Sequence, residues 1–242
     1  MKSSLFTKRS VKSLKMKHLD LYAKVEHLLG IEEATDALHS LYMSELDGLE
    51  VKTLLDVGCG RGGFIKRVQA KGIEVKGCDP SSVMAKECQK EGLDVVCGEI
   101  ESVEGSFDAI VSIFDVLNFM DKERLTNFLD EVAKRLNEDG VFIADVNTKY
   151  GFSEVAEGVM SAEDEDGFLN VDASFVNDKL TTTFTFFEKQ DDERYLKHQE
   201  QIMQHFHPIK FFQNHKALKL VEKQTFSLYD TNDKTLLIFQ KR

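Results

Sequence analysis

A glycine-rich turn between a strand and a helix is the feature that most limits how this chain can fold. The turn covers residues 56–62, Asp-Val-Gly-Cys-Gly-Arg-Gly, after an apolar run and before a helical pattern. Gly58, Gly60 and Gly63 fit the spacing G-x-G-x-x-G, and Asp79 ends the next apolar run. Such a turn lets the backbone approach a nucleotide-like cofactor, because glycine has no side chain to collide with it. By itself the spacing also fits a dinucleotide-binding oxidoreductase.

Strand and helix patterns alternate around this turn. Apolar runs predict five strands, at 52–57, 74–78, 94–97, 109–114 and 141–146. Between them, helices are expected at 62–70, after Ser81 and Ser82, and from Asp121 to Gly140. Alternation at these lengths predicts a parallel sheet with helices on both faces. The expected fold class is therefore α/β, with a Rossmann-like, doubly wound, mostly parallel sheet.

The pattern changes on both sides of this core. Residues 18–48 predict helix, because their apolar residues fall on one face. After Asn147, alternating apolar residues predict three extended segments, at 169–175, 180–187 and 195–206. These segments lie too close together for crossover helices and indicate a small antiparallel β insert. A helix at 208–218 and two strands at 221–228 and 235–239 are expected to complete the sheet.

These patterns divide the chain into four segments. They are an N-terminal helical segment covering the active site at 1–50, a cofactor-binding Rossmann-like core at 51–147, an antiparallel β insert or lid at 148–206, and a C-terminal helix with the last two core strands at 207–242. An acidic run at 163–166 lies within the insert. It fits a solvated loop, or a lid that attracts a cationic acceptor.

Asp56, two residues before Gly58, separates the two cofactor classes. A nicotinamide cofactor places a pyrophosphate over such a turn, where a carboxylate would repel it. S-adenosylmethionine instead brings an ammonium group, which a carboxylate attracts. The expected C-terminal helix and strands also leave no second domain for a hydride acceptor. Both features favour S-adenosylmethionine.

Residues 54–62, LLDVGCGRG, resemble motif I of the class I S-adenosylmethionine-dependent methyltransferases. FDAIVS at 107–112 is similar to the fourth strand of that family, and LNEDGVF at 136–142 to the turn into its fifth. DVLNF at 115–119 and DVNTKY at 145–150 resemble a bacterial small-molecule-type subgroup with an antiparallel insert after strand five, which includes relatives acting on amino sugars. The resemblance implies a seven-stranded sheet, S-adenosylmethionine as cofactor with S-adenosylhomocysteine as product, and a small-molecule acceptor methylated at N or O.

The resemblance also implies where the cofactor binds. Asp79 is expected to accept hydrogen bonds from both ribose hydroxyls, although an Asp at this place also caps helices. The acid that faces the adenine amino group in the family is Glu99 here, with the backbone of Ile100 as the alternative. Met84 and Phe114 fit an ordinary core equally well. The residues expected at the cofactor are Asp56, Gly58, Cys59, Gly60, Asp79, Pro80, Met84, Glu99, Ile100, Phe114, Asp115 and Asn118.

Methyl transfer requires no unique catalytic residue. The sulfonium is already activated, and the protein mainly aligns donor and acceptor. A general base is needed only for an acceptor that arrives protonated, and the candidates are Tyr150, Tyr195, His205 and His207. His205 and His207 share one face of an extended segment, a spacing that also occurs on solvated surface strands. Tyr22 and Tyr150 are candidates to roof the site, where an aromatic ring attracts a sulfonium.

Two classes of base methyltransferase are excluded by missing motifs. The chain contains no Pro-Pro, so it lacks the [DNS]-P-P-[YFW] motif of the enzymes that methylate base amino groups, and neither proline precedes a cysteine nucleophile. A magnesium-assisted mechanism stays open as an alternative, because Asp115, Asp145 and Asn147 carry oxygen ligands of the kind magnesium prefers. The same residues also fit loop and acceptor positioning, so no metal is predicted.

Charge and composition limit the partners. The formal net charge of −11 argues against a broad surface for nucleic acid or anionic lipid. A basic arm from Lys2 to Lys17 is the exception, and it fits either a frayed end or contact with a phosphate-bearing partner. No apolar run approaches the ~20 residues of a membrane span, and the four cysteines form no C-x-x-C pair, which indicates a reducing cytoplasm.

Two other functions stay open beside the small-molecule methyltransferase. One is an enzyme of the same fold that acts on tRNA or protein, guided by the basic arm. The other is a protein that binds S-adenosylmethionine without transferring its methyl group. The sequence predicts neither the acceptor nor the oligomeric state.

Overall fold

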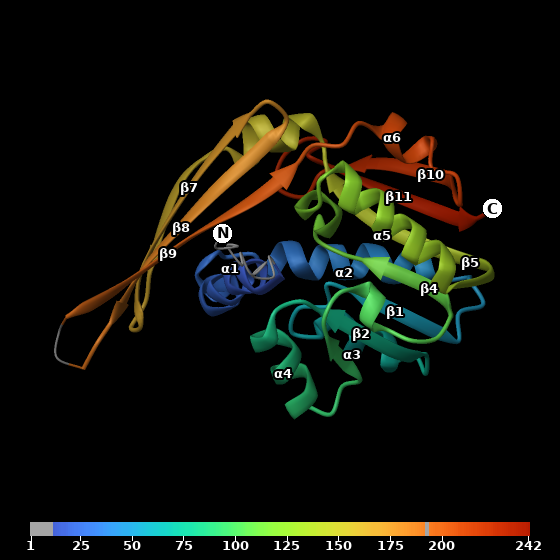
Figure 1. Cartoon of the computed structure of the whole chain (residues 1–242), viewed down its shortest axis with the longest axis horizontal. Coiled ribbons are helices and arrows are strands. Elements are labelled where there is room, and N and C mark those ends of the chain that lie inside the picture. Colours follow the sequence, from blue (N-terminus) through green and yellow to red (C-terminus); the bar gives the residue numbers. More distant parts are fainter. Residues whose placement is uncertain (1–11, 192–193) are drawn as a thin grey trace, which may run out of the picture.

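The computed structural model describes residues 12–191 and 194–242 and divides their strands between two sheets (Figure 1). The larger sheet has seven strands in the order β10-β11-β5-β4-β1-β2-β3. These are β1 (Thr53–Val57), β2 (Glu74–Asp79), β3 (Val95–Cys97), β4 (Phe107–Ser112), β5 (Leu136–Asn147), β10 (Leu218–Phe226) and β11 (Lys234–Lys241). The strands from β5 to β3 pair in parallel, and β11 is antiparallel to both β5 and β10. The expected α/β fold, with a mostly parallel seven-stranded sheet, is confirmed.

Helices cover both faces of this sheet. The α-helices are α1 (Lys12–Val25), α2 (Glu32–Leu46), α3 (Gly63–Gln69), α4 (Ser82–Lys90), α5 (Lys122–Arg135) and α6 (Ile209–Gln213). Short turns are η1 (Glu26–Leu28), η2 (Ile100–Ser102), η3 (Val116–Phe119) and the π-helical η4 (Gly151–Ala156). On one face α2 and α3 bury Leu38 and Phe64, and on the other α5 buries Leu125 and Leu129. The central strands are apolar because both of their faces are covered.

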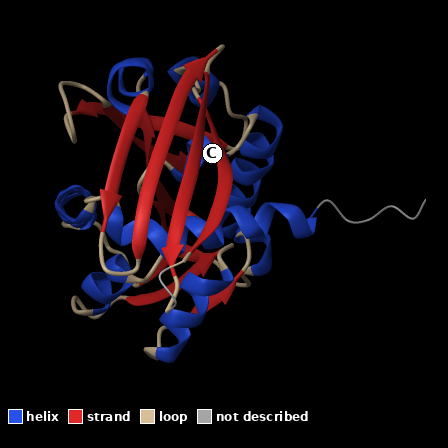
Figure 2. Cartoon of the chain, turned by 90° about the vertical axis from the view of Figure 1, so that its left-hand side faces the viewer, coloured by secondary structure: helices blue, strands red, loops and turns tan. Residues whose placement is uncertain are grey.

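The insert is a separate antiparallel sheet in the order β6-β7-β8-β9. Its strands are β6 (Gly158–Glu163), β7 (Gly167–Val176), β8 (Lys179–Lys189) and β9 (Tyr195–His205). Figure 1 shows it extending to one side of the core, and Figure 2 shows its strands side by side. Leu21 and Val25 of α1 pack against Leu169, Phe184 and Ile202 of the insert. The antiparallel insert expected from the sequence is thus present, and α1 lies against one of its faces.

Parallel pairing brings the carboxyl ends of β1, β2, β4 and β5 to one edge of the larger sheet. The chain passes from β1 to β2 on one side, whereas β4 lies on the other side of β1. Such a reversal of strand order opens a crevice at the carboxyl ends, where α/β proteins bind their ligands. The loop after β1 and the turn after β4 therefore lie on opposite sides of this crevice.

Several expected boundaries are wrong. The helix expected to end at Gly140 ends at Arg135, because Leu136 is buried and pairs with Phe107 at the start of β5. The helix expected at 208–218 is only α6, since β10 already begins at Leu218. The helix expected at 18–48 is interrupted at Gly30, which has φ +62°. Strand β6 was not expected, because almost all of its residues are exposed and show no apolar alternation.

Two features bear on partners. No helix in the part of the chain that the structure describes is long and apolar enough to cross a membrane. The basic side chains of the expected N-terminal arm lie outside the side chains that the structure describes.

Candidate active site

A cavity of about 2040 Å³ lies at the carboxyl edge of the larger sheet. Its floor includes the loop after β1 and the turn after β4, at Gly58 and Phe114. Tyr22 of α1 and Phe184 of β8 line it from the N-terminal helix and the insert, and their rings meet edge to face. Cofactor core, N-terminal helix and insert thus enclose one space, which is large enough for a nucleoside and a second small molecule.

The loop after β1 requires glycine at Gly58. This residue has φ +79°, and a Cβ built there would lie 2.8 Å from Cγ2 of Val116. The N–H of Gly58 donates to the carbonyl of Cys78 at 2.8 Å, which fixes the loop against the end of β2. The backbone can therefore line the cavity at a place where a side chain would displace the turn after β4.

Asp79 holds the loop from the tip of β2. Its Oδ2 accepts the N–H of Gly60 at 3.0 Å, and its Oδ1 accepts the N–H of Ser81 at 2.8 Å. Burial raises the pKa of this carboxyl, and the two backbone N–H groups oppose that rise. Asp79 also lines the cavity, and each oxygen keeps a lone pair for a further donor. The loop-shaping role and a ribose-binding role are therefore compatible.

Asp56, at the end of β1, is a buried carboxyl that lines the same cavity and is only 2% exposed. Burial, with the nearby carboxylate of Asp79 as the second cause, raises its pKa to about 8. A cation placed beside it would favour the ionised form. Asp56 is therefore suited to an ammonium ligand.

The N-terminal helix is attached to the cofactor loop by polar contacts. Arg61 donates from Nη2 to the carbonyl of Ala23 at 2.6 Å and pairs with Glu26 at 3.0 Å. On the far side of the loop, Ser81 donates to Asp20 at 2.9 Å. These contacts hold α1 and η1 over the glycine-rich loop.

The turn after β4 has a strained backbone. Phe114 and Asp115 have φ +69° and +51°, which is the left-handed region that side chains disfavour. Asp145 of β5 holds both, because its carboxylate accepts the N–H of Phe114 at 2.8 Å and that of Asp115 at 2.9 Å. The hydroxyl of Tyr42 also donates to Asp145 at 2.8 Å. The buried Asp145 thus shapes one wall of the cavity without lining it.

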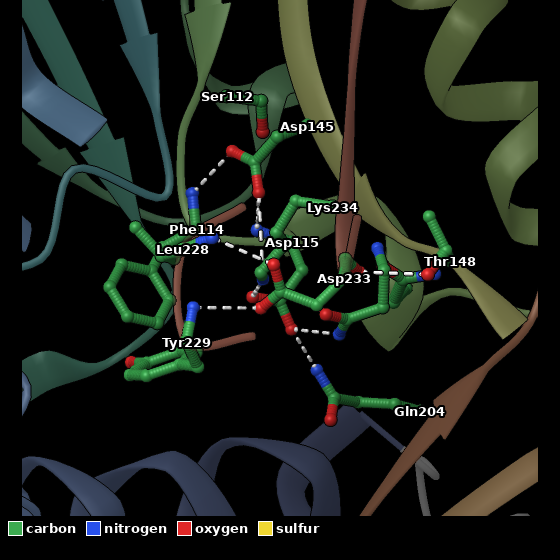
Figure 3. A network of polar contacts seen from close by, with 12 residues as sticks. Ser112, Phe114, Asp115, Asp145, Thr148, Gln204, Leu228, Tyr229, Asp233 and Lys234 are labelled. Carbon is green, nitrogen blue, oxygen red and sulfur yellow. Dashed lines mark hydrogen bonds and ion pairs between the residues drawn. The ribbon is translucent and has the colours of Figure 1, made fainter. Parts of the chain in front are cut away.

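Asp115 is the centre of a buried polar network (Figure 3). Its Oδ1 lies 2.6 Å from Nζ of Lys234, which is 2% exposed at the start of β11. Its Oδ2 accepts Nδ2 of Asn147 at 2.9 Å and Nε2 of Gln204 at 2.5 Å. Nζ of Lys234 also lies 3.7 Å from Oδ2 of Asp145.

This network argues against magnesium binding by the three residues that the sequence offered as ligands. Asp115, Asp145 and Asn147 do lie close together. The ammonium of Lys234, however, already pairs with the carboxylates of both aspartates. A second cation at this place would be repelled by Lys234. In the described residues no group of three or more His, Cys, Asp or Glu has the arrangement of a metal site.

Eleven of the twelve residues expected at the cofactor line the cavity. They are Asp56, Gly58, Cys59, Gly60, Asp79, Pro80, Met84, Glu99, Ile100, Phe114 and Asp115. Asn118 does not line it: its side chain is fully buried, accepts the N–H of Asn147 at 2.9 Å and donates to the carbonyl of His205 at 2.8 Å. Glu99 lines the cavity while its carboxylate pairs with Arg124 at 2.8 Å.

The four candidate bases separate into two groups. His205 and His207 line the cavity at the end of β9, with ring centroids 6.3 Å apart, and burial lowers the pKa of both. Nε2 of His207 lies 2.9 Å from the carbonyl of Met120, so this nitrogen carries the proton. Tyr150 is exposed and donates to Asp230, and Tyr195 is exposed at the opposite end of β9. Neither tyrosine lines the cavity.

Sequence reasoning missed three residues of this region, Tyr42, Gln204 and Lys234. A weak signal existed for two of them. Tyr42 lies four residues from Leu38 and Leu46 on the apolar face of α2, so its hydroxyl had to find a buried partner. Lys234 begins a run of buried residues, where a cation needs an anion. Gln204 gave no signal.

Sequence comparison relates part of the chain to known methyltransferases. Residues 54–140 match the family model of a methyltransferase domain. A protein of Geobacillus sp. (strain WCH70) named as a methyltransferase is 26% identical over 161 residues, which cover 62% of this chain and 65% of that protein. The chain thus spans slightly less than two thirds of the length of this curated relative.

Solved structures share the fold across nearly the whole chain. An S-adenosylmethionine-dependent methyltransferase from Clostridium acetobutylicum ATCC 824 superposes with a TM-score of 0.72 at 20% identity, covering 94% of this chain and 98% of that one. An amino pentose methyltransferase from Micromonospora echinaspora, solved with S-adenosylmethionine bound, gives 0.66 at 14% identity and covers 100% of both chains.

The chain has the fold of the class I methyltransferases, and its cavity lies at the carboxyl edge of the larger sheet. Residues 54–140 match a methyltransferase domain, as motif I implied. The fold expected from the sequence is confirmed.

Proposed function

We propose that the protein transfers the methyl group of S-adenosylmethionine to an amine of a small molecule. The observation that carries the proposal is the cavity, which joins the glycine-rich loop to an enclosed space under Tyr22 and Phe184. Methyl transfer needs donor and acceptor in line and shielded from water, and little else from the protein. The hydrogen bond from Gly60 to Asp79 and the buried carboxyl of Asp56 support the donor end of this space.

An amine is favoured over a hydroxyl by charge. Among the described residues, the cavity lining contains eleven Asp or Glu and five Lys or Arg. Such a lining raises the local concentration of cations. The amino pentose methyltransferase that shares this fold is named for an acceptor that carries an amino group. A small amine would therefore be attracted to this cavity as its ammonium form.

An amine that arrives protonated must lose a proton before its nitrogen can attack. We assign this step to His205, which lines the cavity beside Gln204 and whose pKa is lowered by burial. His207 is less suited, because its Nε2 is used by the carbonyl of Met120 and its Nδ1 is buried. Tyr150 and Tyr195 lie outside the cavity lining.

In this proposal each of the four segments of the chain has its own role. Residues 51–147 bind the cofactor, with the eleven cavity-lining residues around it. Residues 1–50 and 148–206 close over the acceptor, and 207–242 complete the sheet and supply Lys234.

Binding calorimetry with S-adenosylmethionine and S-adenosylhomocysteine tests the donor site. We expect Asp79→Ala, and the milder Asp79→Asn, to weaken binding at least about tenfold, because each removes a charge-assisted hydrogen bond to the ribose. Asp94→Ala is the matched control: Asp94 is exposed at the start of β3 and lies outside the cavity lining. Wild-type protein that binds neither compound, or Asp79 variants that bind as tightly as wild type, would refute the proposal.

A panel of small amines then tests the acceptor end. Wild-type protein is mixed with S-adenosylmethionine and a primary amine, a secondary amine or a simple amino sugar, and S-adenosylhomocysteine is quantified. We expect product with at least one amine and none with the matching alcohol. Product formation with the alcohols alone would reverse the choice between nitrogen and oxygen.

A further inference from the structure

The end of β9 reaches the turn after β4 through two neighbouring residues. Nε2 of Gln204 donates to Oδ2 of Asp115 at 2.5 Å, and the carbonyl of His205 accepts Nδ2 of Asn118 at 2.8 Å. Figure 3 shows the Gln204 amide directed at the Asp115 carboxylate. These contacts join the insert to the wall of the cavity that carries Phe114.

The carboxylate that receives Gln204 is itself held on its other side. Oδ1 of Asp115 pairs with Lys234 at 2.6 Å, and this ammonium lies 5.3 Å from the centre of the Phe114 ring. The negative charge of Asp115 raises the pKa of Lys234 although burial opposes it, so the cation persists at neutral pH. The backbone N–H of Asp115 is fixed by Asp145. Three of the contacts that hold Asp115 therefore come from the core sheet, from Lys234, Asp145 and Asn147, and Gln204 adds one from the insert.

The same residues face the cavity from both sides. Phe114 and Asp115 line it from the core, and Phe184 and Gln204 line it from the insert. The Asp115–Gln204 hydrogen bond therefore sets how far the two walls stand apart. In-line transfer requires the reacting atoms to approach to ~3 Å, so a small error in this separation slows the reaction.

We propose that Gln204 and Asp115 are positioning residues that couple the insert to the methyl-donor site. When the donor pocket is filled, the turn at Phe114 and Asp115 is restrained, and Gln204 transmits this restraint to the end of β9. This inference rests on the proposed function, because it supposes that the cavity binds the cofactor. Coupling of this kind is a difference in the stability of one contact between the empty and the filled protein.

Hydrogen exchange with S-adenosylhomocysteine as the probe tests the coupling without an identified acceptor. In wild type, we expect the compound to slow exchange at 200–206 at least about threefold. Gln204→Leu should lose this protection and bind the compound about threefold more weakly, because a contact that binding stabilises must strengthen binding by the same factor. Gln204→Met keeps much of the side-chain length, removes the donor and should behave in the same way.

Gln199→Leu is the matched control. Gln199 lies on the same strand, is exposed, and donates to Thr185 within the insert at 3.0 Å, so its loss removes one amide hydrogen bond without touching Asp115. This variant should keep the wild-type protection. On an amine that wild type methylates, Gln204→Leu should lose at least about tenfold in kcat, and Gln199→Leu less than twofold.

The outcomes separate this inference from the proposed function. If wild type does not bind S-adenosylhomocysteine, the proposed function fails and the coupling fails with it. If wild type binds it and Gln204→Leu is protected as fully as wild type, only the coupling is overturned. A loss of affinity in Gln204→Leu much larger than the lost protection would also overturn it, because Gln204 would then act on the donor site directly.

Discussion

Nζ of Lys234 lies 2.6 Å from Oδ1 of Asp115 and 3.7 Å from Oδ2 of Asp145, and all three residues are buried. Truncation of the cation would leave Asp115 charged, buried and without its ionic partner. Removing one member of a buried ion pair typically costs about 3–5 kcal/mol. We therefore expect Lys234→Met to lower the free energy of unfolding in urea by about 3 kcal/mol.

A surface pair provides the comparison for Lys234. Lys134 pairs with Glu131 at 2.7 Å within α5, and its side chain is 66% exposed. Lys134→Met should cost less than about 1 kcal/mol, because an exposed pair is solvated and screened. Equal losses in the two variants would show that the buried ammonium does not stabilise Asp115.

Alanine substitutions at Gly58 and Gly72 distinguish the cost of a steric clash from the cost of backbone strain. Both have positive φ, +79° and +81°, so alanine costs roughly 1 kcal/mol of conformational energy at either place. Only at Gly58 does the added Cβ meet a neighbour, Cγ2 of Val116 at 2.8 Å, and at Gly72 nothing lies within 4 Å. Gly58→Ala should therefore lose about 1–3 kcal/mol more than Gly72→Ala in urea unfolding.

Cofactor binding should separate the same two variants. Gly58 lines the cavity and Gly72 does not. We expect Gly58→Ala to weaken S-adenosylhomocysteine binding at least about tenfold and Gly72→Ala to leave it unchanged. Similar affinities for both variants would mean that the loop tolerates a side chain.

The part of the site near the glycine-rich loop could be predicted from the sequence because it is local. Gly58, Gly60 and Asp79 belong to one strand–loop–helix–strand unit, and parallel pairing of β1 with β2 brings them together. The network around Asp115 could not, since Gln204 and Lys234 join it from 89 and 119 residues away. No local pattern encodes such a pairing, and it depends on how two sheets dock.

The predicted ends of helices and strands were wrong where tertiary contacts outweighed the local conformational preference of the sequence. Gly140 looked like the end of a helix, yet the core buries Leu136 and starts β5 earlier. Asp139, with φ +64°, makes the turn inside that strand. Strand β6 has no buried face to produce an alternating pattern, so hydrogen bonds to β7 alone define it.

Tyr42 stabilises the turn after β4 through Asp145. Its hydroxyl donates to Oδ1 of this buried carboxyl at 2.8 Å. Tyr42→Phe removes the donor and leaves the carboxylate less satisfied, which typically costs about 1–3 kcal/mol. We expect this loss in urea unfolding. The pKa of Asp145, already raised by burial, should rise further, because the Tyr42 hydrogen bond lowers it.

Tyr150→Phe is the control for Tyr42, and it also tests Tyr150 as a base. Tyr150 is exposed and donates to Asp230 at 3.0 Å outside the cavity lining. Its loss should leave both the free energy of unfolding and methyl transfer unchanged. A large fall in kcat with intact stability would restore Tyr150 as a catalytic candidate.

Asp56 should make cofactor binding release a proton. Its folded pKa is about 8, far above the ordinary 3.8, because burial and the charge of Asp79 favour the neutral acid. The stability that this group contributes is therefore present below pH 4 and is lost as pH rises through 8. At pH 7, below this pKa, the neutral acid predominates in the empty protein. An ammonium bound beside it favours the carboxylate, so the proton leaves.

Calorimetry of S-adenosylhomocysteine in two buffers of different ionisation enthalpy measures this proton at pH 7. Wild type should release up to one proton more than Asp56→Asn, and the difference should disappear at pH 9, where Asp56 is already ionised. Asp94→Asn, at an exposed carboxyl, should match wild type. Equal proton release by wild type and Asp56→Asn at pH 7 would show that the ammonium does not bind at Asp56.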